Sequence, residues 1–148
     1  MISRSLIAAA LSLCVASPAL AREVPGIIAE AARSAGVPVA LAQGVAHVET
    51  RHRCGMIGGV GERGPVQIRP STARGLGYRG PAAGLSDCRT GAAWGMRYLR
   101  LALDRAGGDW MRGATLYNAG VYSRRTRSAY GRRVLAAASA FWRVAGAR

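Results

Sequence analysis

Acidic side chains are scarce in this sequence, and one of them lies where an acid catalyst could work. The 148 residues contain 7 aspartates and glutamates against 21 arginines and no lysine, which gives a formal net charge of +14. Glu49 borders an apolar row at helical spacing and precedes a glycine-rich stretch between residues 55 and 84. Partial burial raises the pKa of a carboxyl group, and a carboxyl that is protonated near neutral pH can protonate a leaving group. Glu49 is therefore a candidate general acid, and its alternative role is an ion pair with Arg51 or Arg53.

Cysteine and histidine are the other side chains that could carry chemistry. A predicted signal peptide, described below, contains Cys14 and leaves Cys54 and Cys88 as an even pair. Such a pair in an exported chain favours a disulfide, with two buried free thiols as the alternative. His47 and His52 are five residues apart and form no H-E-x-x-H motif with Glu49, so we predict neither a metal site nor a cofactor.

Proline, glycine and aspartate punctuate the sequence in a way that predicts helices almost throughout. Proline is favoured at the start of a helix, glycine just past its end, and aspartate as an N-cap. The predicted helices run from Pro25 to Gly36, from Pro38 past Glu49, from Ser71 to Leu76, from Ser86 or Asp87 to about Ala106, from Asp109 through Tyr117, and from about Arg127 to Val144. The inward face of the last helix is predicted to be Val134, Leu135, Ala138 and Trp142. Only Val66 to Ile68 suggests a strand, and the predicted fold class is all-α.

The first 21 residues are typical of a secretory signal peptide. Arg4 precedes an apolar run, and Ala19-Leu20-Ala21 fits a small-x-small cleavage site. The alternative is an ordinary N-terminal helix. Cleavage after Ala21 would leave residues 22–148 with a net charge of +13 and no segment apolar enough to span a membrane. We therefore expect a periplasmic or secreted protein.

Several segments in order resemble the soluble lytic transglycosylase (SLT) family, whose relatives include goose-type lysozymes. They are Glu49-Thr50, a loop with Gly61 and Gly64, Val66-Gln67-Ile68, Met96-Arg97-Tyr98-Leu99, Leu116-Tyr117-Asn118-Ala119-Gly120, and Tyr130 with Arg133-Val134-Leu135. In that family the catalytic glutamate stands eighteen residues before the glutamine of a Gly-Leu-Met-Gln segment, and Glu49 and Gln67 are eighteen residues apart. The resemblance extends from Pro38 to Leu135. It implies a lysozyme-like domain over residues 22–148, with a glycine-rich loop beside the catalytic helix.

The resemblance also implies a role for individual residues. Glu49 matches the catalytic acid, and Gln67 matches a polar residue of the substrate cleft. Tyr117 and Asn118 match a pair that lines the floor near the acid and helps to orient it, and Tyr130 matches an aromatic residue that faces the same groove. Gln67 could instead satisfy backbone groups of the loop, and both tyrosines could be core aromatics.

The sequence departs from the family pattern at several positions. Thr50 replaces serine, Pro65-Val66 replaces Leu-Met, and Gly58 stands where the family often has a serine near the substrate. Cys54 and Cys88 both stand where the family often has proline. This paired exchange implies that the two cysteines are close together and bonded.

The chemistry implied by the resemblance is cleavage of the β-1,4 bond between N-acetylmuramic acid and N-acetylglucosamine in peptidoglycan. Glu49 would first donate a proton to the glycosidic oxygen and then, as carboxylate, accept the proton of the muramic acid C6 hydroxyl. That hydroxyl closes on C1 and gives a 1,6-anhydro product. Small exported members of the family often serve a secretion system, pilus or flagellum, so a partner of this kind is compatible with the sequence.

Two other functions are compatible with the sequence. Gly61-Glu62-Arg63-Gly64 resembles the goose-type segment with an acidic residue that positions water, so Glu62 could be the second carboxylate of a hydrolysing muramidase. Glu62 could also be a solvated loop residue paired with an arginine. The alternative of another class is a non-catalytic cationic protein that binds the wall or nucleic acid.

The distribution of the arginines favours one of these partners. Most are scattered along the chain, and a single group, here called the arginine patch, consists of Arg124, Arg125, Arg127, Arg132 and Arg133. Peptidoglycan carries lactyl and peptide carboxylates, which account for the positive charge. We therefore expect peptidoglycan strands, rather than nucleic acid, as the partner.

Overall fold

Seven helical segments make up the part of the chain that the computed structural model describes, residues 18–146, with side chains described for residues 23–143. They are α1 (Pro18–Ala35), α2 (Val39–Thr50), α3 (Pro70–Gly75), the 3-10 helix η1 (Ala82–Ser86), α4 (Cys88–Arg105), α5 (Trp110–Ala119) and α6 (Ala129–Gly146). Over this range there is no β-strand, and Arg63 forms two isolated bridges, with Ile57 and with Ile68. The prediction of an all-α fold is confirmed.

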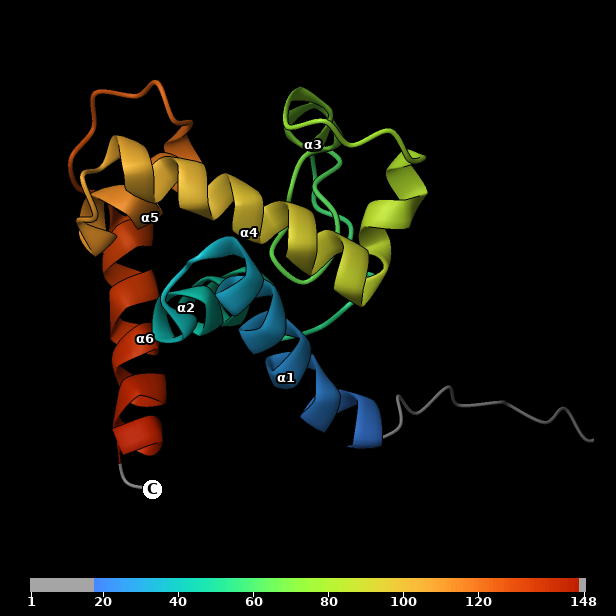
Figure 1. Cartoon of the computed structure of the whole chain (residues 1–148), viewed down its shortest axis with the longest axis horizontal. Helices are drawn as coiled ribbons and strands as arrows, with labels where there is room; N and C mark the ends of the chain where they lie inside the picture. The colour runs from blue at the N-terminus through green and yellow to red at the C-terminus, as the bar shows by residue number, and fades with distance from the viewer. Residues whose placement is uncertain (1–17, 147–148) are drawn as a thin grey trace, which may run out of the picture.

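Helix α2 is central to the arrangement that positions the candidate acid. It packs against both α1 and α6, while α4 packs against α1 and α5 (Figure 1). At Gly44 a Cβ atom would lie 2.5 Å from the carbonyl oxygen of Val134 and 3.0 Å from the amide nitrogen of Ala138. Glycine therefore allows the backbones of α2 and α6 to approach closely. This contact fixes the end of α2 relative to the start of α6.

The core consists of the apolar faces of these helices. Leu41 and Val45 of α2 are fully buried together with Met96 and Leu99 of α4 and Leu116 of α5. Burying an aliphatic side chain of this size contributes about 1.5 to 3 kcal/mol. The predicted apolar stripe beside Glu49 is therefore the core face of α2.

Aspartate side chains begin α4 and α5 as the sequence predicts. Asp87 accepts a hydrogen bond from the amide of Thr90 at 2.9 Å, and Asp109 accepts one from the amide of Arg112 at 2.7 Å. Each bond satisfies one of the amides that have no partner within the helix, a contribution of about 1 kcal/mol. Both N-cap predictions are confirmed.

The predicted start of the first helix is wrong. Helix α1 begins at Pro18 rather than at Pro25, so Pro25 lies inside the helix. An interior proline lacks the amide hydrogen that bonds four residues back, at a cost of about 3 kcal/mol. If the signal peptide is cleaved after Ala21, Pro25 falls in the first turn of the remaining helix, where that amide has no partner in any case.

The predicted inward face of α6 is also wrong at one position. Val134 and Ala138 are buried and Leu135 is partly buried, but the Trp142 side chain is 66% exposed. Its ring meets the ring of Trp110 at 6.4 Å between centroids, nearly edge to face. Trp142 lies near the end of α6 and remains largely exposed although its ring meets an aromatic ring of α5.

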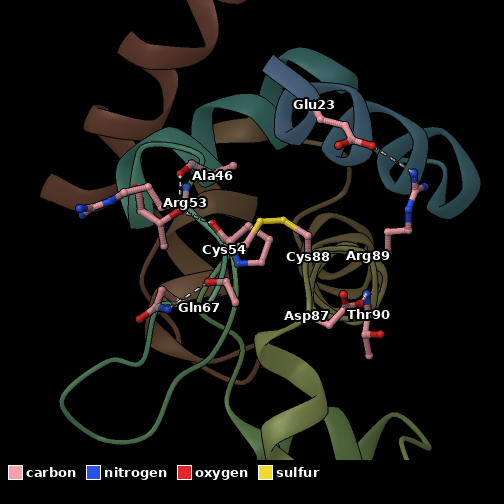
Figure 2. The surroundings of a disulfide bond; sticks show 12 residues. Glu23, Ala46, Arg53, Cys54, Gln67, Asp87, Cys88, Arg89 and Thr90 are labelled. Atoms are coloured by element: carbon pink, nitrogen blue, oxygen red, sulfur yellow. Dashed lines mark hydrogen bonds and ion pairs between the residues drawn. A yellow bond between two sulfur atoms is a disulfide. The ribbon is translucent and has the colours of Figure 1, made fainter. Parts of the chain in front are cut away.

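A disulfide ties the long loop after α2 to the start of α4. Cys54 lies in the loop and Cys88 is the first residue of α4, with their Cα atoms 5.2 Å apart and a bond between their sulfurs (Figure 2). The amide of Gly55 also donates a hydrogen bond to the carbonyl oxygen of Ser86 at 3.0 Å. The predicted pairing of Cys54 with Cys88 is therefore present in the structure.

The predicted signal peptide falls largely outside the described residues. Residues 1–17 lie outside them, and residues 18–21 form the start of α1. Within the described range, no helix is both long and apolar enough to cross a membrane.

Candidate active site

Glu49 lies in the last turn of α2, partly buried, and has one side-chain partner. The phenolic oxygen of Tyr130, near the start of α6, donates a hydrogen bond to Glu49 Oε1 at 2.6 Å. Burial raises the pKa of the Glu49 carboxyl above its ordinary value, and the negative charge of Glu62 raises it further. The Tyr130 hydrogen bond and the charge of Arg133 act in the opposite direction but do not cancel the rise. Glu49 is thus held toward the protonated form that a general acid needs.

The chain turns sharply after Glu49, and a buried threonine secures the turn. Thr50 is 2% exposed, and its hydroxyl lies 2.8 Å from the carbonyl oxygen of Pro65, to which it donates. The hydroxyl oxygen of Thr50 also accepts a hydrogen bond from the backbone amide of Arg53 at 3.1 Å. Thr50 therefore keeps the hydroxyl of the serine it replaces, and this hydroxyl joins the end of α2 to the loop.

Left-handed backbone conformations frame the same loop. Among the described residues, those other than glycine with positive φ are Arg51 (54°), His52 (60°) and Gln67 (52°). Each such residue costs about 1 kcal/mol or more, and such strain is common at functional sites. His52 is held in place by a 2.8 Å contact between its Nε2 and Gln43 Oε1. The strained positions thus lie just after the candidate acid and at the predicted cleft glutamine.

A cavity of about 570 Å³ opens beside Glu49. Its lining comes from the end of α2, the following loop, α3, α4 and the end of α5, and includes Glu49, Glu62, Gln67, Tyr98, Tyr117 and Asn118. Five of these six residues come from the sequence prediction. The structure therefore brings together, at one cleft, residues that are up to 69 positions apart in the chain.

Tyr117 lines the cleft without forming a hydrogen bond to Glu49. It is buried, and its hydroxyl donates to the carbonyl oxygen of Val66 at 2.6 Å. Burial, followed by the charge of Glu49, raises the pKa of Tyr117 well above its ordinary value, so the hydroxyl remains a donor. Tyr117 thus positions the loop, and the hydrogen bond to the acid comes from Tyr130, which does not line the cavity itself. Asn118 is exposed at the cleft.

Gln67 has both of the roles that the sequence leaves open. Its side-chain amide nitrogen Nε2 donates to the carbonyl oxygens of Gly64 at 3.0 Å and Met56 at 3.2 Å, so the side chain satisfies loop backbone groups. It also lines the cleft. The side chain therefore closes the loop on itself while it faces the cavity.

Glu62 lies in the same cleft as Glu49 but in a different electrostatic setting. Its carboxylate accepts hydrogen bonds from Arg69 Nε at 3.3 Å and from the amide of Val60 at 3.2 Å. Partial burial raises the pKa of Glu62, but backbone hydrogen bonds and Arg69 outweigh this effect and bring it below its ordinary value. The cleft therefore combines a carboxyl held toward its protonated form with one held ionised.

The sequence does not single out two other residues of the cleft. Tyr98 of α4 lines it with its ring 5.4 Å from that of Tyr117, and Arg69 lines it next to Glu62. Tyr98 belongs to a segment that resembles the family, which is a signal for the helix but not for the orientation of the ring. The pairing of Arg69 with Glu62 depends on the loop conformation and has no signal in the spacing alone.

Comparison with known proteins identifies the family. The model of the transglycosylase SLT domain matches residues 26–136, which include every residue of the cleft named above. A search of curated proteins finds no significant match. Because the family model covers most of the chain, and the fold and the order of the cleft residues agree with the resemblance, this chain belongs to the transglycosylase SLT domain family.

Proposed function

We propose that the protein is a lytic transglycosylase that cleaves peptidoglycan between N-acetylmuramic acid and N-acetylglucosamine and forms 1,6-anhydromuramic acid. Membership of the SLT family supports transglycosylase activity on peptidoglycan in general. The observation that carries the specific proposal is the setting of Glu49, a partly buried acid hydrogen-bonded by Tyr130 at the edge of a cleft.

The reaction needs one carboxyl group that changes its protonation state twice. The Glu49 carboxyl donates its proton to the glycosidic oxygen, and the bond between that oxygen and C1 of the muramic acid breaks. N-acetylglucosamine leaves with a free 4-hydroxyl group. The Glu49 carboxylate then accepts the proton of the C6 hydroxyl as its oxygen bonds to C1, which restores the acid. Because the attacking hydroxyl belongs to the same sugar, its proximity replaces the capture of a water molecule.

Tyr130 and burial support different halves of this cycle. A donor at 2.6 Å stabilises the carboxylate that forms after the first proton transfer, and burial favours the neutral acid before it. Tyr130 is itself buried, and its pKa lies well above the ordinary value, chiefly because of burial, so it stays a donor. We propose that Tyr130 orients the acid, while Gln67, Tyr117 and Asn118 shape the cleft that receives the glycan.

A hydrolysing muramidase is the second candidate, and the position of Glu62 favours it. Glu62 lines the same cleft and is ionised, as a carboxylate that positions water must be. However, its oxygens already accept hydrogen bonds from Arg69 and from the amide of Val60. These bonds reduce its capacity to act as a base, so we favour the single-carboxylate reaction.

The positive charge and the predicted signal peptide support a site of action at the cell wall. Residues 22–148 carry a net charge of +13, which favours association with the carboxylates of peptidoglycan. We propose that the protein is exported to the periplasm or beyond. An accessory role for a secretion system, pilus or flagellum is compatible with its size.

Replacing Glu49 by glutamine tests the proposal. Glu49→Gln keeps the shape of the side chain but cannot donate a carboxyl proton, so lysis of purified peptidoglycan should fall by about 10²- to 10⁴-fold. Turbidity of a sacculus suspension measures lysis, and co-sedimentation measures binding, which should persist. Glu62→Gln should cost much less. An active Glu49→Gln protein would contradict the assignment, and a protein that binds sacculi but never lyses them would support the non-catalytic alternative.

A further inference from the structure

Position 58 has no side chain, and the atoms around it occupy the space that a side chain would need. A Cβ atom at Gly58 would collide with Glu62 Oε2 and would lie 2.7 Å from Gln67 Oε1. Real Cβ atoms do not approach other heavy atoms within 3.0 Å without displacement of one of them. Gly58 is not among the residues with positive φ, so its backbone does not itself require glycine. The glycine therefore makes room for the cleft side chains.

The Glu62 carboxylate is held in this space by a tight loop. The amide of Gly58 donates to the carbonyl oxygen of Glu62 at 2.8 Å, and the amide of Gly61 donates to the carbonyl oxygen of Gly58 at 3.1 Å. From the other side, Arg69 and the amide of Val60 bind the carboxylate itself. Backbone and side-chain contacts together keep the charge of Glu62 at the cleft.

This charge acts on the candidate acid. Glu49 and Glu62 line the same cavity, and a negative charge on one disfavours a second negative charge on the other. The raised pKa of Glu49 includes this contribution from Glu62, which is partly offset by Arg133 on α6 and by the hydrogen bond from Tyr130. Glu62 thus influences the acid without touching it.

We propose that Gly58 and Glu62 are positioning residues for the acid: the missing side chain at position 58 admits the Glu62 carboxylate to the cleft, and its charge opposes ionisation of Glu49. The inference rests on the proposed role of Glu49 as the general acid. It assigns Glu62 an electrostatic role in place of direct chemistry. It also gives a physical reason for glycine at position 58, where the family often has serine.

The pH dependence of peptidoglycan lysis tests this proposal. Activity should fall at high pH as Glu49 ionises. In Glu62→Gln this fall should move to lower pH, because the negative charge that opposes ionisation of Glu49 is removed. Gly58→Ala should move it in the same direction, because the added methyl group displaces the Glu62 carboxylate. In the double variant, Gly58→Ala should cause no further shift beyond that of Glu62→Gln.

Gly59→Ala is the matched control for Gly58→Ala. It adds the same methyl group to the next residue, where a Cβ would meet no atom within 4 Å. The pH at which activity falls should not move. Thermal melting of each variant checks folding, and Gly58→Ser supplies a second variant with the same Cβ.

Three results would overturn the proposal. The first is that the pH at which activity falls stays unchanged in Glu62→Gln. The second is that Gly58→Ala shifts this pH equally with and without Glu62, because such a shift would act through Gln67 instead. Glu62→Gln could also lose activity at every pH, which would place Glu62 in the chemistry itself. If Glu49→Gln stays active, the proposed function fails. If that variant is inactive and Glu62→Gln shows no shift, only the present inference fails.

Discussion

At the scale of single residues, burial and the hydrogen bond from Tyr130 together set the pH range over which Glu49 can serve as an acid. Burial favours the neutral carboxyl, whereas the Tyr130 hydroxyl, at 2.6 Å, favours the carboxylate. The first influence is larger, so the carboxyl is protonated at a higher pH than a free glutamate. Activity should therefore be present below the raised pKa and be lost as the pH rises through it.

Tyr130→Phe should move this loss of activity to higher pH. The variant removes the hydroxyl that stabilises the carboxylate, so the pKa of Glu49 should rise further. The maximum rate should fall, because the acid is less well oriented. The measurement is the rate of sacculus lysis from pH 4 to pH 9. Tyr122→Phe is the control, because Tyr122 is 82% exposed outside the cleft. A shift to lower pH in Tyr130→Phe would contradict the assigned role.

The sequence predicts the identity of the candidate acid better than its surroundings. The spacing of Glu49 and Gln67 matches the family that the sequence resembles, and both residues line the cleft. The partnership of Tyr130 with Glu49 joins residues 81 positions apart, so it depends on the packing of α2 against α6. Local spacing carries no information about that packing. The resemblance assigns the role of orienting Glu49 to Tyr117 and Asn118. In the structure the Tyr117 hydroxyl donates to the carbonyl oxygen of Val66.

At the scale of elements, the disulfide determines how firmly the cleft loop is attached to α4. It joins two residues 34 positions apart, and the segment between them contains Gly58, Glu62 and Gln67. In the chain-entropy model, a cross-link over a loop of this length stabilises the folded state by about 3 to 4 kcal/mol.

Replacing both cysteines should therefore lower the free energy of unfolding by about this amount. The Cys54→Ser/Cys88→Ser double variant is compared with the oxidised protein by urea denaturation. Reductant should destabilise the oxidised protein to a similar extent. It should leave the stability of the double variant unchanged, and this comparison is the internal control. Two alkylatable thiols in the protein purified without reductant would show that the bond is absent.

The start of a helix can be predicted from the sequence where a capping side chain marks it. Asp87 and Asp109 accept bonds from their own helix amides, and that interaction is local in sequence. The exposure of Trp142 cannot be predicted from local sequence. Its spacing fits the apolar face of α6, but the spacing does not show that the core ends before this residue. The 3-10 helix η1 is missing from the prediction because it is short and begins within the glycine-rich stretch.

At the scale of the whole molecule, the arginine patch is the densest group of charges along the sequence. All five of its residues are exposed. Arg133 lies close enough to Glu49 to lower its pKa, so this member of the patch also affects the cleft. Arg124, Arg125 and Arg127 lie between α5 and α6 and do not line the cavity. These three arginines are therefore the better test of adhesion to the wall.

Neutralising Arg124, Arg125 and Arg127 with glutamine should weaken binding to sacculi and flatten its salt dependence. Exposed charges act over about 8 Å at physiological salt, so added salt should remove most of the difference from the unmodified protein. Turnover of a short soluble glycan should be unaffected. Co-sedimentation over a range of salt concentrations measures the binding.

The control for the patch is an equal change of charge elsewhere on the surface. Arg74, Arg79 and Arg143 are exposed and separated along the chain, so replacing them by glutamine should reduce sacculus binding less. Equal losses in both triple variants would mean that net charge, rather than the patch, governs adhesion. Loss of turnover with unchanged sacculus binding in the patch variant would place the three arginines in the active cleft.

The mass of the products released from purified peptidoglycan tests the central claim most directly. If Glu49 directs the C6 hydroxyl of muramic acid to C1, the muropeptides should end in 1,6-anhydromuramic acid and weigh one water less than hydrolysis products. They should also resist reduction by borohydride, because they lack a free reducing end. Products with a free reducing end and the mass of added water would contradict the account and make the protein a muramidase.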